Sequence, residues 1–204
     1  LLLIELNDIK FMSRCIELAS KNIGYTYPNP LVGSVIVCDN KIIGEGSHVK
    51  YGESHAEVNA INSVKDKRLL KNSTLYVNLE PCNHHGKTPP CTEAIINNNI
   101  KKIVIGSQDP NNLVNGSGIE KLRSSGCNVS VGVMKKGCDE LNKRFFTYHR
   151  LRRPFIILKW AESKDGFISP TKSVKTLKRV NWISGEDAKK LSHKWRSEEH
   201  SILV

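Results

Sequence analysis

The sequence has no apolar run that approaches the roughly 20 residues needed for a membrane-spanning helix. The opening stretch Leu1–Ile4 is interrupted by Glu5 and Asp8, too soon for the apolar core of a secretory signal peptide, and no small-residue cleavage site follows it. Internal repeats and low-complexity tracts are also absent. We therefore expect no membrane partner and a cytoplasmic location.

The composition excludes wholesale disorder and a collagen-like chain, because 39% of the 204 residues are hydrophobic and 25% are charged, as in ordinary globular proteins. Without a secretion signal, the six cysteines predict no disulfide framework. Cys82 and Cys91 lie among histidines and turn residues, and no pattern assigns a role to Cys138. The remaining three lie in apolar stretches and are predicted to be buried like small hydrophobic residues: Cys15, Cys38 and Cys127.

Positive charge predominates, with a formal net charge of +11, and it is concentrated toward the end of the chain. Residues 143–204 hold 15 basic and 6 acidic residues, net +9, whereas residues 1–142 hold 16 and 14, net +2. A basic block can bind nucleic acid or a phosphorylated ligand, and it can also be a solvated surface. The charge alone leaves these three interpretations open.

Strands and helices alternate along most of the chain, because apolar side chains recur at strand or helix spacing between turn residues. This order predicts an α/β fold with a largely parallel sheet and helices on both faces. Ser54 and Glu57 have the spacing of a capping box, and Gly44 and Gly46 predict a close backbone approach. The predicted strands are 34–38, 41–46, 74–79, 102–106 and 128–133, with a hairpin turn at 39–40; the predicted helices are 8–22, one beginning near 54, 91–98, 119–125 and 136–148.

A second unit is expected after the basic stretch Arg150–Pro154, so we place a domain boundary between residues 150 and 151. An apolar strand is predicted at 155–160, a helix at 186–197, and a strand that is only beginning at 201–204. We therefore expect residues 151–204 to be the start of a truncated domain, and the chain to be a fragment of a longer protein.

One imidazole and two thiols are placed as in a zinc site. His55 stands at the start of a predicted helix, Cys82 follows the strand 74–79, and Cys91 begins another helix, where the backbone dipole favours a thiolate. Three such ligands fill three of the four tetrahedral positions of zinc and leave the fourth for water, as in catalytic sites. The sequence therefore predicts one catalytic Zn²⁺ bound by His55, Cys82 and Cys91.

Glu57 lies two residues after His55, in the same first helical turn. A carboxylate there can reach a water on the metal without ligating the metal, which suits a proton shuttle. His-x-Glu followed by Pro-Cys and a second Cys is the arrangement of zinc nucleobase deaminases. The alternative is a closed structural zinc site, in which His84 or His85 would supply the fourth ligand.

The spacing of the two cysteines departs from the nucleobase-deaminase signature, because eight residues separate them instead of two. The inserted residues include His84, His85 and Lys87. A catalytic zinc does not need these side chains, so we expect the insertion to face the substrate. For His85 a solvent-facing position is favoured, and for Lys87 a phosphate contact and a solvated position remain equally open.

Five segments follow one another along the chain: Pro28–Gly33, Gly44–His48, His55–Glu57, Glu80–Cys91 and Gln108–Pro110. Their order resembles that of the deaminase domain of bifunctional riboflavin-biosynthesis deaminase/reductases. The resemblance to this family covers essentially the whole chain. The eight-residue spacing, with His-Gly-Lys-Thr-Pro-Pro inside it, is highly specific to that family. The resemblance implies a cytidine-deaminase-like three-layer α/β/α sandwich with a mixed, mostly parallel sheet in residues 1–150. It implies the truncated start of a second α/β domain, similar to dihydrofolate reductase, in residues 151–204.

The resemblance also implies a reaction, the zinc-dependent hydrolytic deamination of 2,5-diamino-6-ribosylamino-4(3H)-pyrimidinone 5′-phosphate. Glu57 would carry protons from water to the ring nitrogen and to the leaving amine. The family's pyrimidine and ribose-phosphate pocket matches four positions here: Asn29, His48, His84 and Lys87. Binding of the phosphate would account for part of the positive charge, so we expect no nucleic-acid partner. Members of the family are usually oligomeric, so the resemblance also implies a homo-oligomer.

The reductase domain of the family reduces the ribose with NADPH, and residues 151–204 resemble only its beginning. Lys159, Trp182 and Arg196 match positions that contact nucleotide or substrate there, whereas Lys164 stands where the family usually has leucine. Because the nucleotide-binding part of that domain is missing, we expect no reductase activity in this chain. NADPH would be a cofactor only of a full-length protein.

Two alternatives stay open. A tRNA adenosine deaminase or a dCMP-type deaminase would share the fold and the chemistry, but the long spacing between Cys82 and Cys91 and the position of the charge excess disfavour the tRNA enzyme. A non-catalytic zinc-binding interaction module belongs to a different class. It predicts a four-ligand metal and no loss of function on Glu57→Gln.

Overall fold

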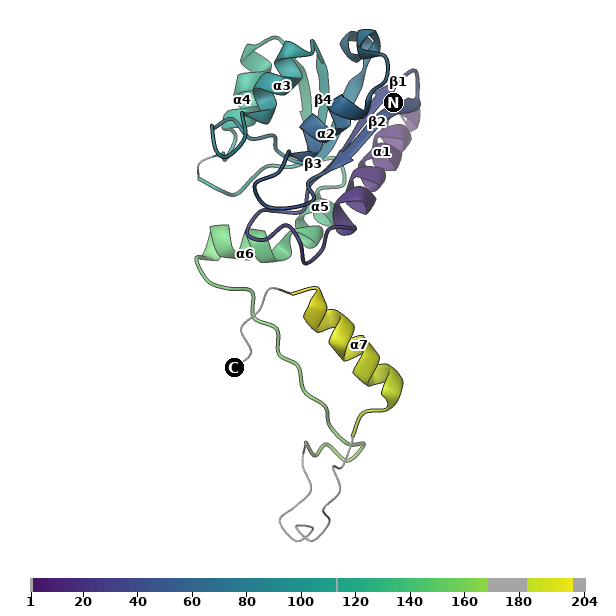
Figure 1. Cartoon of the computed structure of the whole chain (residues 1–204), viewed down its shortest axis with the longest axis vertical. Helices are drawn as coiled ribbons and strands as arrows, with labels where there is room; N and C mark the ends of the chain where they lie inside the picture. The colour runs from purple at the N-terminus through teal and green to yellow at the C-terminus, as the bar shows by residue number, and fades with distance from the viewer. Residues whose placement is uncertain (1, 113, 169–182, 200–204) are drawn as a thin grey trace. The chain divides into compact units, whose positions relative to one another are not determined.

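The computed structural model describes residues 2–112, 114–168 and 183–199, and the chain divides into two compact units, Leu1–Phe155 and Ile156–Val204. The first unit is built on a mixed five-stranded sheet in the order β2-β1-β3-β4-β5 (Figure 1). β1 pairs antiparallel with β2 and β3, whereas the pairs β3–β4 and β4–β5 are parallel. The strands are β1 (Gly33–Cys38), β2 (Lys41–Ser47), β3 (Thr74–Leu79), β4 (Lys102–Ser107) and β5 (Asn128–Val131).

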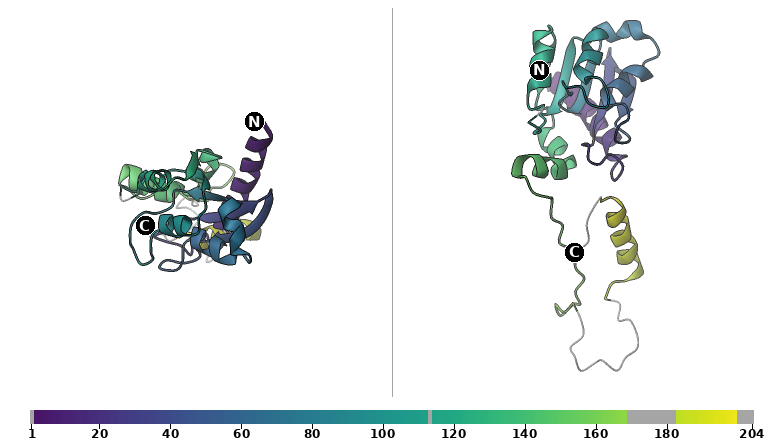
Figure 2. Two further views of the ribbon diagram at one scale, coloured as in Figure 1. Left: turned by 90° about the horizontal axis from the view of Figure 1, so that it is seen from above. Right: turned by 60° about the vertical axis from the view of Figure 1, so that its left-hand side comes forward.

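Helices cover both faces of this sheet, as the views in Figures 1 and 2 show. One layer consists of α2 (Ala56–Ser63), α3 (Cys91–Asn97) and α4 (Ser117–Ser124), with the short 3-10 helix η1 (Lys67–Asn72). The opposite layer consists of α1 (Leu2–Ser20) and α5 (Lys135–Leu141), and α6 (Lys143–Leu151) follows α5. The predicted three-layer sandwich with a mixed sheet is confirmed.

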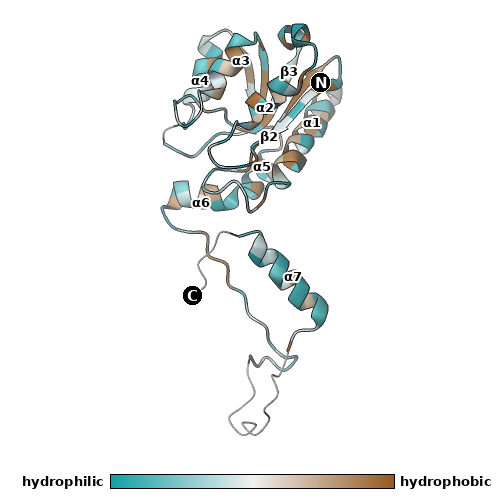
Figure 3. Cartoon of the chain, in the orientation of Figure 1, coloured by the Kyte–Doolittle hydropathy of each residue, from teal (hydrophilic) through white to brown (hydrophobic). Residues whose placement is uncertain are grey.

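Alternation along the strands explains the two layers. Ile36 of β1 and Leu75 of β3 pack under α2, α3 and α4, whereas Val35 and Tyr76, their neighbours in sequence, pack under α1 and α5. Successive side chains of a strand point to opposite faces, so each strand supplies both cores. The hydropathy colouring of Figure 3 shows the strands as predominantly apolar between helices that are polar on their outer sides.

Two helices depart from the sequence prediction. The first begins at Leu2 instead of residue 8, and the helix predicted at 136–148 is divided into α5 and α6 at Asn142. Asn142 is buried, and its side chain accepts a hydrogen bond from the Leu31 backbone N–H at 2.8 Å and donates one to the Leu31 carbonyl at 2.9 Å. This long-range pairing holds the helix break against the 25–33 loop, and helical periodicity alone could not reveal it.

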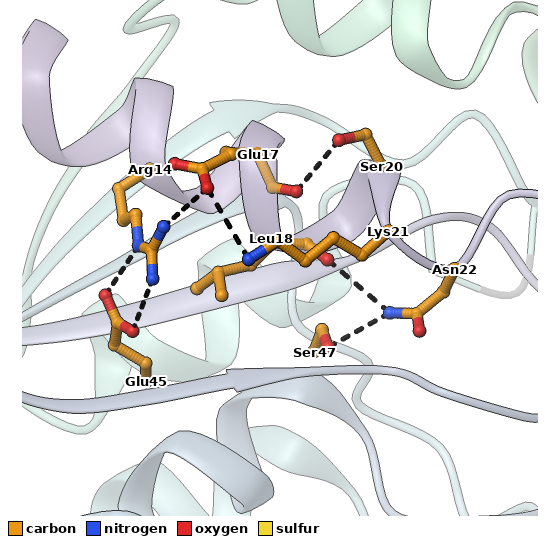
Figure 4. A network of polar contacts seen from close by, with 8 residues as sticks. All are labelled: Arg14, Glu17, Leu18, Ser20, Lys21, Asn22, Glu45 and Ser47. Atoms are coloured by element: carbon orange, nitrogen blue, oxygen red, sulfur yellow. Dashed lines mark hydrogen bonds and ion pairs between the residues drawn. The ribbon is translucent and has the colours of Figure 1, made fainter.

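The predicted hairpin and close approach are both confirmed. Asp39 and Asn40 have φ angles of 50° and 60°, the left-handed pair that a two-residue turn requires. A Cβ placed on Gly46 would lie 2.3 Å from the Ala60 backbone nitrogen, so only glycine lets β2 approach α2 this closely. On the other face, Arg14 of α1 binds both carboxylate oxygens of Glu45 at 2.7 and 2.9 Å (Figure 4).

All six cysteines are free. The structure buries the three cysteines predicted to be buried, Cys15, Cys38 and Cys127. Cys138, a residue of α5, is buried in the core between the sheet and helices α1 and α5. Among the described residues, no helix has the length and apolar character needed to span a membrane.

The second unit contains the predicted C-terminal helix as α7 (Glu186–Ser197). The strand predicted at 155–160 is wrong for these residues, because they form no strand and expose Leu158 and Trp160. A strand needs a hydrogen-bonded neighbour, and the described residues supply none for this segment. The strand predicted at 201–204 lies outside the described residues.

Candidate zinc site and active-site pocket

The candidate site lies where parallel strands β3 and β4 end. The chain leaves β3 into the 80–90 loop, which carries Cys82, and then enters α3 at Cys91. His55 is the N-cap residue of α2 and brings its imidazole to the same place. The carboxyl end of a parallel sheet is the usual position of ligand sites in open α/β folds.

The structure brings the three predicted metal ligands together. His55 Nδ1 lies 3.2 Å from Cys91 Sγ and 3.4 Å from Cys82 Sγ, and the three donor atoms all lie within 4.8 Å of one another. One imidazole nitrogen and two sulfurs converging at this separation fit the tetrahedral preference and the ligand chemistry of Zn²⁺. No other group of three such side chains converges in this way among the residues that the structure describes.

The two thiols titrate as a pair. The hydrogen bond from Cys91 and the imidazole of His55 lower the pKa of Cys82 well below its usual range, whereas the same hydrogen bond and burial raise the pKa of Cys91. The Cys82 thiol therefore loses its proton readily, whereas the Cys91 thiol loses its proton only if a further positive charge stabilises the thiolate. A divalent cation supplies this charge, because it binds the deprotonated forms of both thiols.

Glu57 lies in the first turn of α2, is 3% exposed and borders the same pocket as His55 and Cys82. Burial raises the pKa of its carboxyl to about 7. The predicted capping box is wrong, because the N-cap of α2 is His55, not Ser54, and no side chain caps the helix. Glu57 borders the pocket, and its carboxyl also receives hydrogen bonds from its own backbone N–H and from the Cys91 thiol, so a titratable carboxyl lies beside the candidate metal ligands.

Asn29 and His48 form a second side of the pocket. Asn29 Nδ2 lies 3.0 Å from His48 Nε2, and His48 Nδ1 lies 3.2 Å from the Ser54 carbonyl. Because Nδ1 then donates to the carbonyl, Nε2 accepts from Asn29. Burial lowers the pKa of His48, which favours this neutral form, and its ring meets the His55 ring edge-on at 5.3 Å between centroids.

The pocket has a volume of about 280 Å³, and its mouth includes the inserted loop. His84 and Lys87 both line it, and the Lys87 ammonium lies 4.1 Å from the centre of the Tyr51 ring. His85 is exposed, as favoured by the sequence, and its Nε2 lies 3.6 Å from the carboxylate of Glu93. Neither histidine belongs to the group of donors that can hold a metal.

Sequence reasoning assigned no role to three residues that also line the pocket, Asp109, Asn111 and Phe145. Asp109 is buried, burial raises the pKa of its carboxyl to about 7, and it accepts a hydrogen bond from the Asn111 backbone N–H at 2.7 Å. Their position directly after β4 was the available signal, since β3 and β4 are parallel neighbours whose carboxyl ends meet. Phe145 comes from α6, and no local pattern marked it.

The predicted reductase contacts belong to the second unit. Lys159 and Arg196 are exposed residues of the second unit, and Trp182 lies outside the described residues. Their assignment stays a prediction.

Comparison with known proteins identifies the family. Residues 6–107 match the family described as the cytidine and deoxycytidylate deaminase zinc-binding region. The chain is 46% identical over 198 residues to the riboflavin biosynthesis protein RibD of Aquifex aeolicus, which covers 97% of this chain and 53% of that protein. It is 49% identical over 149 residues to the diaminohydroxyphosphoribosylamino-pyrimidine deaminase of Buchnera aphidicola, covering 73% of this chain and all of that protein.

A solved structure of Acinetobacter baumannii RibD superimposes with a TM-score of 0.87 at 38% identity, over 95% of this chain and 52% of that one. The chain thus spans about half the length of the RibD proteins that it matches. Together with the converging His55, Cys82 and Cys91, these matches show that the chain belongs to the cytidine and deoxycytidylate deaminase family, in the group formed by the riboflavin-biosynthesis deaminases.

Proposed function

We propose that this chain hydrolyses the exocyclic amine of 2,5-diamino-6-ribosylamino-4(3H)-pyrimidinone 5′-phosphate, releasing ammonia and 5-amino-6-ribosylaminouracil 5′-phosphate. The observation that carries the proposal is the convergence of one imidazole and two thiols beside a pocket that His55, Cys82 and the buried Glu57 carboxyl line. The identity to the Buchnera deaminase, whose whole length is covered, supports the choice of substrate.

His55, Cys82 and Cys91 would hold one Zn²⁺, which when bound supplies Lewis-acid activation of a water molecule. Glu57 performs the proton transfers: it accepts a proton from the attacking water and donates it to the ring nitrogen next to the amine-bearing carbon. It then passes the proton of the newly formed hydroxyl group to the amine, and the C–N bond breaks to release ammonia as the carbonyl forms. A carboxyl with a pKa of about 7 can both accept and donate a proton near neutral pH.

The rest of the pocket recognises the substrate. Asn29 and His48 are held by their mutual hydrogen bond beside the metal ligands, where they can orient the pyrimidine ring. Lys87 and His84 border the more exposed mouth, which suits the ribose phosphate. A lysine ammonium is a compact point charge, so Lys87 attracts the phosphate without requiring one fixed geometry.

Three further properties belong to the same proposal. The free state of all six cysteines supports action in a reducing compartment such as the cytoplasm. We expect self-association, as the family resemblance implies. We expect no nucleic-acid partner, because most of the excess of positive charge lies outside residues 1–142. Reduction with NADPH would belong to a longer protein, and the assignment of residues 151–204 to a reductase domain stays a prediction.

The test is ammonia release by the purified, zinc-loaded 204-residue chain from the diaminopyrimidinone ribotide, with cytidine, dCMP and a tRNA anticodon stem-loop in parallel. Turnover of the ribotide alone is expected. Turnover of another substrate instead would retain the zinc chemistry and refute the choice of substrate. Bound zinc without turnover of any of them would refute the enzymatic function and favour a non-catalytic zinc module.

A further inference from the structure

Glu80 is a buried carboxylate that interacts with the backbone of a distant segment. It follows β3 directly and is 4% exposed. Its side chain accepts four hydrogen bonds, and each comes from a backbone N–H group 29 to 39 positions later in the chain. Desolvating a carboxylate is costly unless its oxygens are satisfied, so this arrangement is specific to the folded chain.

The four donors lie at the two ends of one loop. Oε2 accepts from Asp109 at 3.1 Å and from Gly116 at 3.0 Å, and Oε1 accepts from Gly118 at 3.0 Å and from Ile119 at 3.2 Å. Gly118 and Ile119 are in the first turn of α4, where backbone N–H groups have no partner within the helix. Glu80 therefore replaces the missing cap of α4 and joins its start to the end of β4.

The described residues between these two ends, 109–112 and 114–116, contribute to the pocket wall. Asp109, Asn111 and Val114 all line the pocket that contains His55 and Glu57. Because one carboxylate holds both ends of the segment, its oxygens determine how far these side chains project toward the metal ligands. Glu80 itself also borders the pocket, but both of its oxygens already accept two hydrogen bonds, so we expect its effect on a substrate to pass through the segment.

The packing prevents the start of α4 from moving closer to the 80–90 loop. A Cβ added at Gly118 would lie 2.1 Å from the Pro81 carbonyl oxygen and 3.2 Å from Glu80 Oε1. The helix start is thus in backbone contact with the loop that carries Cys82. If the carboxylate is lost, the start of α4 can move only away from this contact, and the residues joined to it lose their fixed position beside the pocket.

We propose that Glu80 is a positioning residue that holds Asp109, Asn111 and Val114 at the distance required for binding the pyrimidine substrate. The inference rests on the proposed function and deepens it, because it assigns substrate affinity to a group outside the predicted site. His55, Glu57 and Cys91 lie on other elements, whereas Cys82 follows Glu80 by two residues on the same loop. We expect loss of Glu80 to weaken substrate binding more than the chemical step, and zinc content shows whether Cys82 is also disturbed.

The test compares Glu80→Gln with Glu120→Gln in the full 204-residue chain. Glu120 is an exposed residue of the same first turn of α4, so the control makes the same chemical change without touching the wall. In Glu80→Gln the amide group must face backbone N–H donors, and unsatisfied buried donors of this kind shift equilibria by about tenfold or more. We expect KM for the ribotide to rise about tenfold or more, with kcat within about threefold of wild type.

Zinc content and amide hydrogen exchange complete the test. We expect one zinc per chain in both variants, and faster exchange in Glu80→Gln confined to 109–119. An unchanged KM with only a lower melting temperature would overturn the proposal, as would a loss of zinc or an equal fall in kcat. If the wild-type chain deaminates another pyrimidine, KM is measured on that one. If it deaminates none, the proposed function has failed, and unchanged exchange in 109–119 would overturn the positioning role by itself.

Discussion

Gly46→Ala tests whether the contact between β2 and α2 positions the candidate site. The added Cβ would lie 2.3 Å from the Ala60 nitrogen and 2.5 Å from the Ala56 carbonyl oxygen, whereas ordinary contacts begin at 3.4 Å. Both neighbours are backbone atoms, so α2 must shift as a body by about 1 Å. Overpacking of this kind destabilises by about 1–3 kcal/mol.

The shift also affects chemistry, because α2 carries His55 at its N-cap and Glu57 in its first turn. A displacement of about 1 Å at a catalytic group can reduce turnover by about 100-fold. We therefore expect Gly46→Ala to lose activity far beyond the small fraction of chains that its lower stability would leave unfolded.

The assays are urea unfolding and ammonia release at 25 °C, with zinc content measured on the same samples. Gly137→Ala is the matched control, since it lies within α5 and its Cβ would meet only the ends of two flexible side chains, Ile16 Cδ1 at 3.4 Å and Met134 Cε at 3.9 Å. The control should be neutral or slightly stabilising. Wild-type stability and turnover in Gly46→Ala would refute the reasoning, and lower stability with full turnover would refute the coupling between this contact and the site.

The remaining predictions concern the metal, the proton shuttle, the phosphate and acid stability. Glu57→Gln should retain one zinc per chain by metal analysis and lose about 100-fold to 10,000-fold in kcat, and a metal-free or fully active variant would contradict the proton-transfer role. Chelation should abolish ammonia release, and added Zn²⁺ should restore it. Lys87→Ala should raise KM for the ribotide about tenfold while leaving KM for the unphosphorylated nucleoside unchanged, and equal effects on both would argue against a phosphate contact. The hydrogen bond from Arg14 lowers the pKa of Glu45 below 4.5, so this pair should stabilise the fold by about 1 kcal/mol above that pH and lose the contribution as the pH falls through the lowered value. Urea unfolding of Glu45→Gln should therefore show a lower stability than wild type at pH 7, and the difference should shrink as the pH falls through the lowered pKa of Glu45. A difference that stays constant with pH would disprove the electrostatic origin.

Local patterns in the sequence were sufficient to locate the strands of the sheet and to identify the candidate metal ligands. Strand alternation and helical spacing depend on neighbours within a few residues, so β1, β3 and α3 could be located closely. His55, Cys82 and Cys91 could be proposed because metal ligands are rare residue types at characteristic spacings. The antiparallel placement of β1 between β2 and β3, which makes the sheet mixed, does not follow from local pattern.

Only the tertiary structure decided which polar groups meet across long stretches of chain. The break at Asn142 depends on the Leu31 backbone, the N-cap of α2 falls on His55, and Asp109 reaches the pocket because β4 lies beside β3. Glu80 illustrates the reason most clearly, since its four partners are backbone N–H groups that carry no side-chain signature in the sequence. A carboxylate can be recognised in a sequence, but the donors that satisfy it are known only once the chain has folded.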